Sequence, residues 1–429
     1  MYIWRMDITL SHLIAMLVVA IFVALLARRL SLPYTVGLVI AGIGLALARL
    51  ESGELLTHDF IFDLILPPLL FEAAINVHWR PLRDDFPPVL ILSISGVVVS
   101  AAVVAFGMQA LASWPAATAV VFGVLIAATD PVAVIALFKD IGVSGRLKLL
   151  IESESLFNDG VAAVLFGLAM AWAGAAHGAS LGGIDIVWTF AKVSVGGIAI
   201  GVACALAAVA IARGTSDHLV ETALTFVVAY GAFLLAEHFD VSGVLATVAA
   251  GIAMGNLGVL VETETPTALS SQGRAFVVAF WDFAAFLANS FVFLLIGLRV
   301  AAIPFGTEHW VIVPAAIVLV LVGRAASVYP LCLPFGRSRW AVPMREQHVL
   351  WWGGLRGALA LALALSLPPT FPLNEEILVA TFGVVTFSVI VQGFTMSMLM
   401  KALDLGGVRG AQYLQHPEAG GELLRRRGP

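Results

Sequence analysis

The chain contains about thirteen apolar segments, each long enough to cross a lipid bilayer and separated from the next by a short polar turn. Of its 429 residues, 60% are hydrophobic and only 12% are charged. A soluble domain of ordinary composition carries about 25% charged residues, because water must wet its surface. We therefore predict an all-α polytopic membrane protein that has the lipid bilayer as its main partner and does not bind nucleic acid.

The expected spans begin and end at turns rich in proline, glycine and charged residues. They cover residues 7–27, 33–50, 60–78, 86–111, 114–138, 147–177, 185–212, 219–238, 241–258, 275–298, 308–335, 346–367 and 374–400. Residues 1–403 then form one transmembrane domain. The glycine-rich polar stretch 404–429 is expected to be a short disordered tail.

The distribution of positive charge predicts the orientation. With the N-terminus outside, seventeen Lys and Arg residues fall in the inside loops and the tail, three in outside loops and three within spans. Cytoplasmic loops carry the excess of Lys and Arg in membrane proteins. The sequence therefore predicts a plasma (bacterial inner) membrane protein with an external N-terminus and a cytoplasmic C-terminus.

Six ionisable residues lie within the expected spans and away from their ends. They are Glu72, Asp130, Glu154, Asp159, Arg324 and Arg356. Charged groups at this depth are costly, and they usually pair with one another or mark a pathway for ions or substrate. We therefore treat these residues as the candidate functional site.

The sixth span places several oxygen-bearing side chains on one face. Glu154 and Asn158 are four residues apart, as are Ser155 and Asp159, so all four lie on one broad side of a helix. Hydroxyl, amide and carboxylate oxygens are suitable ligands for a hard cation such as Na⁺. Glu154 and Asn158 could instead satisfy polar groups of neighbouring helices.

Two spans carry signals for an interruption near the middle of the membrane. Pro131 follows Asp130 in the fifth span and disfavours a continuous helix there. In the twelfth span, Gly353, Gly354 and Gly357 surround Arg356. The interruptions are seven spans apart, and an odd offset gives them opposite directions. This pattern predicts two inverted six-helix repeats whose discontinuous helices cross at mid-membrane, as in secondary transporters.

At these residues the sequence resembles the NhaP/NHE-type sodium/proton antiporters, and the resemblance extends over nearly the whole chain. It rests on Thr129-Asp130-Pro131, on Glu154 to Asp159 and on Gly353-Gly354-Leu355-Arg356-Gly357, together with Phe293 to Leu298. It implies a homodimer without enzymatic activity that exchanges Na⁺ or Li⁺ for H⁺ by alternating access. A dimerisation part would cover roughly 1–80 and 215–300, and a mobile core part roughly 84–178 and 305–402.

The resemblance also implies roles for individual residues. Asp159 would carry the ion and the proton in turn. Asn158 would assist, and Na⁺ would be held by Asp159, Ser155, the Thr129 carbonyl and Glu72. Glu154 and Arg324 would form a structural ion pair. Asp130 and Arg356 would compensate the charges at the half-helix ends.

Proton accounting leads to a prediction about stoichiometry. Asn158 does not titrate and Arg324 does not lose its proton in proteins, so Asp159 is the one obvious proton carrier, unless Glu72 also releases a proton. We expect electroneutral one-for-one exchange without a cofactor. K⁺/H⁺ exchange is the nearest alternative, and an intramembrane aspartyl protease that uses Asp130 and Asp159 is a remote one.

Overall fold

The computed structural model describes residues 2–30, 34–48, 60–174, 183–259, 269–302 and 309–405. Within these ranges the chain forms helices and turns, and no strand is present. Each of the thirteen predicted spans coincides with one helix or with successive helical pieces, and in two spans a short non-helical break separates the pieces. Seven of the resulting segments are long and apolar enough, by length and composition, to cross a membrane. Of the predicted tail, residues 406–429 lie outside the described ranges.

Eight of the predicted spans are continuous α-helices in the described residues. They are α1 (Tyr2–Leu30), α2 (Tyr34–Leu47), α5 (Phe86–Ala112), α8 (Arg146–Gly174), α9 (Gly183–Ala212), α10 (His218–His238), α12 (Ser271–Ala302) and α13 (His309–Cys332). A short surface helix, α4 (Trp79–Asp84), precedes α5, and the 3₁₀ turn η3 (Leu333–Phe335) follows α13.

Two spans are interrupted where the sequence predicts a break. The fifth consists of α6 (Ala116–Leu125) and α7 (Val132–Ile141), and the twelfth consists of α14 (Met344–Trp352) and α15 (Ala358–Leu365). Pro131 lies directly before α7, where its missing N–H costs no helical hydrogen bond. Each half-helix is too short to cross a bilayer alone, since crossing takes about 20 residues.

Three further spans contain a π-helical turn that the sequence analysis did not predict. Turn η1 (Phe60–Ile65) leads into α3 (Leu66–Ile75), and η2 (Gly255–Val259) follows α11 (Gly243–Met254). In the last span, η4 (Ser388–Gln392) separates α16 (Asn374–Phe387) from α17 (Gly393–Ala402). A π-turn inserts one residue into a helix, and in a run that is apolar on nearly every side this shift leaves no mark in the hydrophobicity.

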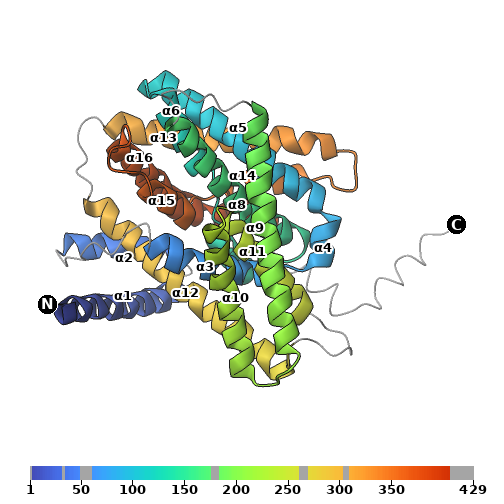
Figure 1. The fold of residues 1–429 in the computed structure, drawn as a ribbon. Helices are drawn as coiled ribbons and strands as arrows, with labels where there is room; N and C mark the ends of the chain where they lie inside the picture. Colours follow the sequence, from blue (N-terminus) through green and yellow to red (C-terminus); the bar gives the residue numbers. More distant parts are fainter. Residues whose placement is uncertain are drawn as a thin grey trace, which may run out of the picture.

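The helices form two groups, which can be followed in Figure 1. In the first group, α13 packs along α5, and α6 and α8 pack against α5 and each other, while α14, α15 and α16 complete it. In the second group, α2 and α3 pack on α12, and α11 packs on α3 and α10. Helix α9 runs beside α10 and α11, and α1 lies against α2 and α12.

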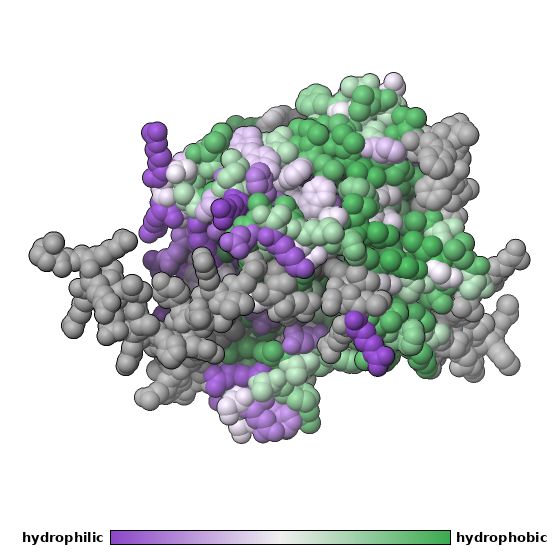
Figure 2. Space-filling view, turned by 180° about the vertical axis from the view of Figure 1, so that it is seen from behind, coloured by the Kyte–Doolittle hydropathy of each residue, from purple (hydrophilic) through white to green (hydrophobic). Residues whose placement is uncertain are grey.

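The surface fits a protein surrounded by lipid. Figure 2 shows hydrophobic side chains over much of one face, with hydrophilic ones gathered mainly toward one side. Large apolar side chains that would be buried in a soluble protein are exposed here, including Phe22, Phe106 and Trp188 at 66%, 73% and 72%. Exposed apolar surface on this scale is stable in lipid and not in water.

Candidate cation-binding site between the two helix groups

The two interrupted spans meet at their breaks, and a charged residue of each span interacts with the half-helix ends of the other. The backbone N–H of Asp130 donates to the Leu355 carbonyl at 2.8 Å, which joins the two breaks directly. Arg356 donates from Nη1 to the carbonyls of Ala127 and Ala128, at 2.6 and 3.0 Å, beyond the end of α6. The guanidinium therefore faces the negative end of a half-helix, as the sign of the helix dipole requires.

Asp130 satisfies the opposite kind of helix end. Its Oδ1 accepts from the backbone N–H of Val132, at the start of α7, at 2.9 Å. Its carboxylate also lies close to the backbone N–H of Ala358, the first residue of α15. Helix N-termini carry unsatisfied N–H groups and partial positive charge, so this one carboxylate stabilises two half-helices.

Glu154 and Arg324 form a buried bidentate ion pair. Arg324 donates from Nη1 and Nη2 to the two Glu154 oxygens, both at 2.8 Å, and from Nε to the Leu350 carbonyl at 3.2 Å. Only 2% of Glu154 and 5% of Arg324 is exposed. The pair links α8, α13 and α14, and removing one partner would leave the other as an uncompensated buried charge.

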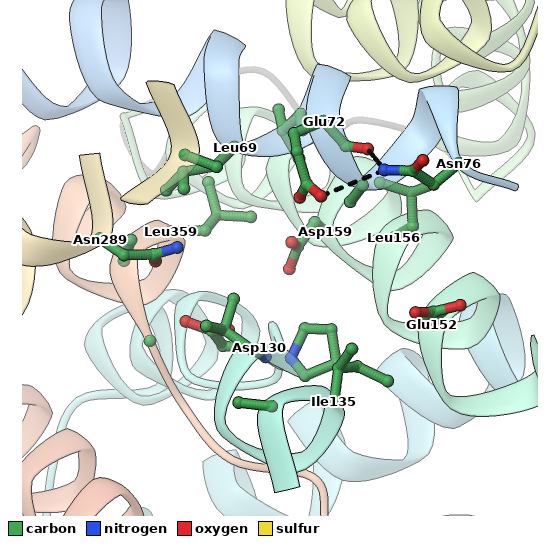
Figure 3. A pocket seen from close by; sticks show the side chains of 18 of the residues that line it. Leu69, Glu72, Asn76, Asp130, Ile135, Glu152, Leu156, Asp159, Asn289 and Leu359 are labelled. Atoms are coloured by element: carbon green, nitrogen blue, oxygen red, sulfur yellow. Dashed lines mark hydrogen bonds between the residues drawn. The ribbon is translucent and has the colours of Figure 1, made fainter. Parts of the chain in front are cut away.

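A cavity of about 580 Å³ lies between the two helix groups, and acidic side chains line it. Figure 3 shows Asp159 near its centre, with Glu72 on one side, Asp130 on another and Asn289 projecting from α12. Asn76, His78 and Asp282, which are exposed, also line the cavity, whereas Thr129 and Asn289 are buried. The cavity therefore leads inward from an open end near the start of α8 to the crossing of the broken spans.

Oxygen atoms of Ser155 and Thr129 lie one helical turn along α8 from Asp159. The Ser155 hydroxyl, one turn earlier on α8, donates to the Thr129 carbonyl, and Thr129 Oγ1 lies 3.1 Å from Ser155 Oγ. Asp159 Oδ1 is buried and has no hydrogen-bond partner among the described residues. Buried polar atoms are nearly always hydrogen-bonded, so this unpartnered oxygen is suited to bind an ion or a proton.

Glu72 faces the cavity from α3. Its Oε1 accepts from Asn76 Nδ2 at 3.1 Å, and the same amide nitrogen lies 2.9 Å from the Glu72 carbonyl oxygen. Asn76, one helical turn later, thus fixes the carboxylate in the cavity. The sequence analysis did not identify Asn76, because an asparagine at the end of an expected span has no distinguishing pattern.

The remaining predicted ligand, Asn158, has a different environment. Its Nδ2 donates to Glu154 Oε1 at 3.3 Å, and it is absent from the described residues that line the cavity. The amide nitrogen of Asn158 thus faces the ion pair, in agreement with the alternative in which it satisfies a neighbouring polar group. Its Oδ1 is buried without a hydrogen-bond partner among the described residues, which agrees with the assisting role expected from the resemblance. Ser155, like Asn158, is absent from the described cavity lining.

The charges around Asp159 do not cancel. Asp130, Glu154 and Arg356 are its electrostatic neighbours. Together with Asp159 itself, Glu72 and Arg324, they make four carboxylates and two guanidiniums, a charge of −2 if all are ionised. The low dielectric of a protein interior makes such an imbalance costly, so the site favours the uptake of positive charge.

The comparisons with known proteins agree with this geometry. Residues 15–402 match the family described as the transmembrane sodium/hydrogen exchangers. A low-affinity Na⁺/H⁺ antiporter from Synechocystis, NhaS1, is 38% identical and covers 95% of this chain, which spans 77% of that protein. The Na⁺/H⁺ antiporter NhaH from Halobacillus aidingensis is 34% identical, with 92% and 98% of the two chains covered.

A solved structure shares the fold. The sodium proton antiporter MjNhaP1 from Methanocaldococcus jannaschii superposes with a TM-score of 0.73 at 19% identity, over 93% of this chain and 99% of that one. The broken spans that meet at Asp130 and Arg356 are thus found in a chain whose sequence and architecture both match the same group of transporters. This protein belongs to the transmembrane sodium/hydrogen exchanger family.

Proposed function

We propose that Na⁺ and H⁺ compete for Asp159, and that one Na⁺ or Li⁺ crosses the membrane for each H⁺ that crosses in the opposite direction. Exchange of Na⁺ for H⁺ is the activity of the family to which the chain belongs. The observation that carries the assignment to Asp159 is its unpartnered oxygen on a residue that lines the cavity, one helical turn from Ser155 and its bond to the Thr129 carbonyl. Glu72 completes the proposed set of ligands from the other helix group.

The cost of moving bare charge couples the two fluxes. An empty, ionised Asp159 would carry an uncompensated charge through a low-dielectric barrier, at a cost of several kcal/mol. Binding of either H⁺ or Na⁺ neutralises the carboxylate and lowers that cost. Only occupied states then change their access, so one ion drives the other without ATP or a cofactor.

The proposed stoichiometry rests on the neighbours of Asp159. Asn158 cannot release a proton, and Arg324 holds its charge in the ion pair with Glu154. Asp130 and Arg356 are occupied at half-helix ends. Asp159 is therefore the proposed proton carrier, and the exchange is electroneutral as long as Glu72 keeps its protonation state.

The positive-charge pattern and the cavity together support an inward-facing state. The cavity opens near the start of α8, beside Lys148 and Glu152, which the excess of Lys and Arg in the expected inside loops assigns to the cytoplasm. We propose that the group containing α5, α8 and α13 moves against the group containing α3 and α12. The second group would also form a homodimer interface in the plasma membrane.

The test is proton flux in proteoliposomes with an imposed pH gradient, after addition of NaCl, LiCl, KCl or choline chloride. Na⁺ and Li⁺ should collapse the gradient in the wild type, whereas Asp159→Asn should be inactive although folded. The apparent KM for Na⁺ should rise as the pH falls, because the protonated carboxylate cannot bind Na⁺. An imposed membrane potential should leave the rate unchanged, and a clear voltage dependence would contradict electroneutral exchange.

The same experiment separates the alternatives. Collapse by K⁺ as well would keep the mechanism and change the substrate, and transport by Asp159→Asn would refute the site. A protease dyad requires two aspartates that share one proton. The hydrogen bond that Asp130 accepts from Val132 N–H, and its position near Ala358 N–H, oppose that role, because they hold its carboxylate at two helix ends.

A further inference from the structure

Asn289 of α12 is a polar side chain that the proposed mechanism does not use. It lines the cavity that contains Asp159, yet only 6% of the residue is exposed. Its Oδ1 is buried without a hydrogen-bond partner among the described residues. In Figure 3 the amide projects from α12 into the space around Asp159 and Asp130. A buried amide oxygen is costly to leave unpaired, which indicates that this oxygen has a partner during function.

Tyr34, at the start of α2, lies next to this amide. The Tyr34 hydroxyl and the Asn289 side chain are polar neighbours, and Asp130 and Glu72 are the charged neighbours of that hydroxyl. Asn289 Oδ1 has no hydrogen-bond partner among the described residues, so the amide nitrogen is the atom suited to donate to the hydroxyl oxygen. The amide oxygen is left without a partner.

Close packing holds this pair of residues in place. Helices α2 and α12 approach so closely at Gly42 and Gly297 that a Cβ on either glycine would collide with the backbone of the other helix. The Tyr34 ring also stacks on Phe286, one turn before Asn289, with centroids 6.1 Å apart. A ligand oxygen on such a rigid support keeps its geometry without a large loss of entropy on binding.

The lining residues of α12 and α8 form two stripes along the cavity. Asp282 and Asn289 are seven residues apart on α12, as are Glu152 and Asp159 on α8, so each pair lies on one helical face. In both stripes an acidic residue lies nearer the open end and an oxygen donor lies deeper. A cation that moves inward would therefore meet Asn289 from the second helix group at the depth where it meets Asp159 from the first.

We propose that Asn289 Oδ1 is a ligand for the transported cation, supplied by the second helix group and available only while the cavity is open. This inference rests on the proposed alternating access. A neutral amide oxygen can replace a water molecule of the hydrated ion without adding charge. Asn289 would thus lower the cost of dehydrating Na⁺ on the cavity side, and it would have no effect on binding from the opposite side.

The experiment measures the apparent KM for Na⁺ separately from the two sides, in everted and in right-side-out membrane vesicles. Asn289→Leu keeps the side-chain volume and removes both polar atoms. Its KM for Na⁺ added on the cavity side should rise about tenfold, the effect expected for the loss of one direct polar contact. The KM from the opposite side should stay at the wild-type value.

Two further variants distinguish a ligand from a packing role. Asn289→Asp keeps an oxygen and loses the amide donor, so it should bind Na⁺ at alkaline pH at least as well as the wild type. Ser290→Ala is the matched control, because Ser290 is also buried with an unpartnered hydroxyl, and it is absent from the described cavity lining. Its KM should be unchanged on both sides.

The outcomes are separable. If Asn289→Leu leaves the cavity-side KM unchanged, or if Asn289→Asp weakens Na⁺ binding as much as Asn289→Leu does, the ligand role is wrong. A rise in KM of equal size on both sides would also overturn it. If Asn289→Leu does not fold, Asn289→Ala provides the same comparison. Failure of the wild type to exchange Na⁺ for H⁺ would instead refute the proposed function itself.

Discussion

The two helix groups are stabilised in different ways. The first group buries Glu154, Arg324 and Arg356, each at most 5% exposed, and stabilises them through ion pairing and half-helix ends. The second group buries few charges and relies on close backbone contact. At Gly42, a Cβ would meet the Leu294 carbonyl, and at Gly255 it would meet the Ile75 carbonyl.

This difference indicates which substitutions each helix group can tolerate. In the first group, a lost charge leaves its partner unpaired in a low dielectric, which is costly even if the shape is kept. In the second group, charge matters less and added volume matters more, because the helices already touch. The cavity lies between the groups, and it combines Asp130 and Asp159 from the first with Glu72 and the firmly supported Asn289 from the second.

The largest effect is expected from Arg324→Ala. It leaves Glu154 as an unpaired buried carboxylate, so it should lower the free energy of unfolding by about 3–5 kcal/mol. The measurement is thermal unfolding in detergent together with the yield of folded protein. Lys148→Ala is the control, because it removes a more exposed ion pair with Glu152 that is worth about 1 kcal/mol or less. Equal losses in the two variants would contradict the comparison.

A smaller loss is expected from Gly42→Ala in the second group. The added Cβ would collide with the backbone of α12 at Leu294 and Gly297, and overpacking of this kind costs about 1–3 kcal/mol. Gly44→Ala on the same helix is the matched control, since a Cβ there has no neighbour within 4 Å among the described residues. Thermal unfolding should separate the two, and equal melting temperatures would show that α2 and α12 are not tightly constrained.

The smallest effect is expected from Glu221→Gln. Glu221 is fully buried in the second group, where its carboxylate accepts from the Ser270 backbone N–H at 3.0 Å and from the Ser270 hydroxyl at 2.8 Å. Gln keeps an acceptor oxygen, so the loss should be about 1 kcal/mol and Na⁺/H⁺ exchange should continue. Loss of exchange at a normal protein yield would mean that this group also contributes a buried charge to transport.

Much of the architecture could be predicted because lipid imposes strong constraints on sequence. Apolar length marks each span, and the breaks carry Pro131 and the glycines around Arg356. The charged residues of the first group stand out for the same reason, since few ionisable groups are tolerated at that depth. The structure brings Asp159, Glu72 and Thr129 to one cavity, while their roles in transport stay predictions.

The sequence did not reveal the orientation of individual side chains or the part played by uncharged polar residues. Asn289 and Tyr34 carry no charge, and in an apolar run they look like ordinary contacts between helices. One signal was available, because Asn289 follows Asp282 by two turns on the same helical face. The orientation of Asn158 toward Glu154, and the π-turns within three spans, depend on packing between distant segments and have no local pattern.

The exchange of charge between the two breaks also has a consequence for how such a chain can evolve. The first repeat contributes Asp130 to the start of a helix in the second, and the second contributes Arg356 to the end of a helix in the first. Neither repeat carries the full set of charges that its own break requires. A substitution at one break therefore changes the stability of a helix that the other half of the gene encodes. The two halves must accumulate changes in step, and a protein made of one half alone would lack what keeps its broken helix in place.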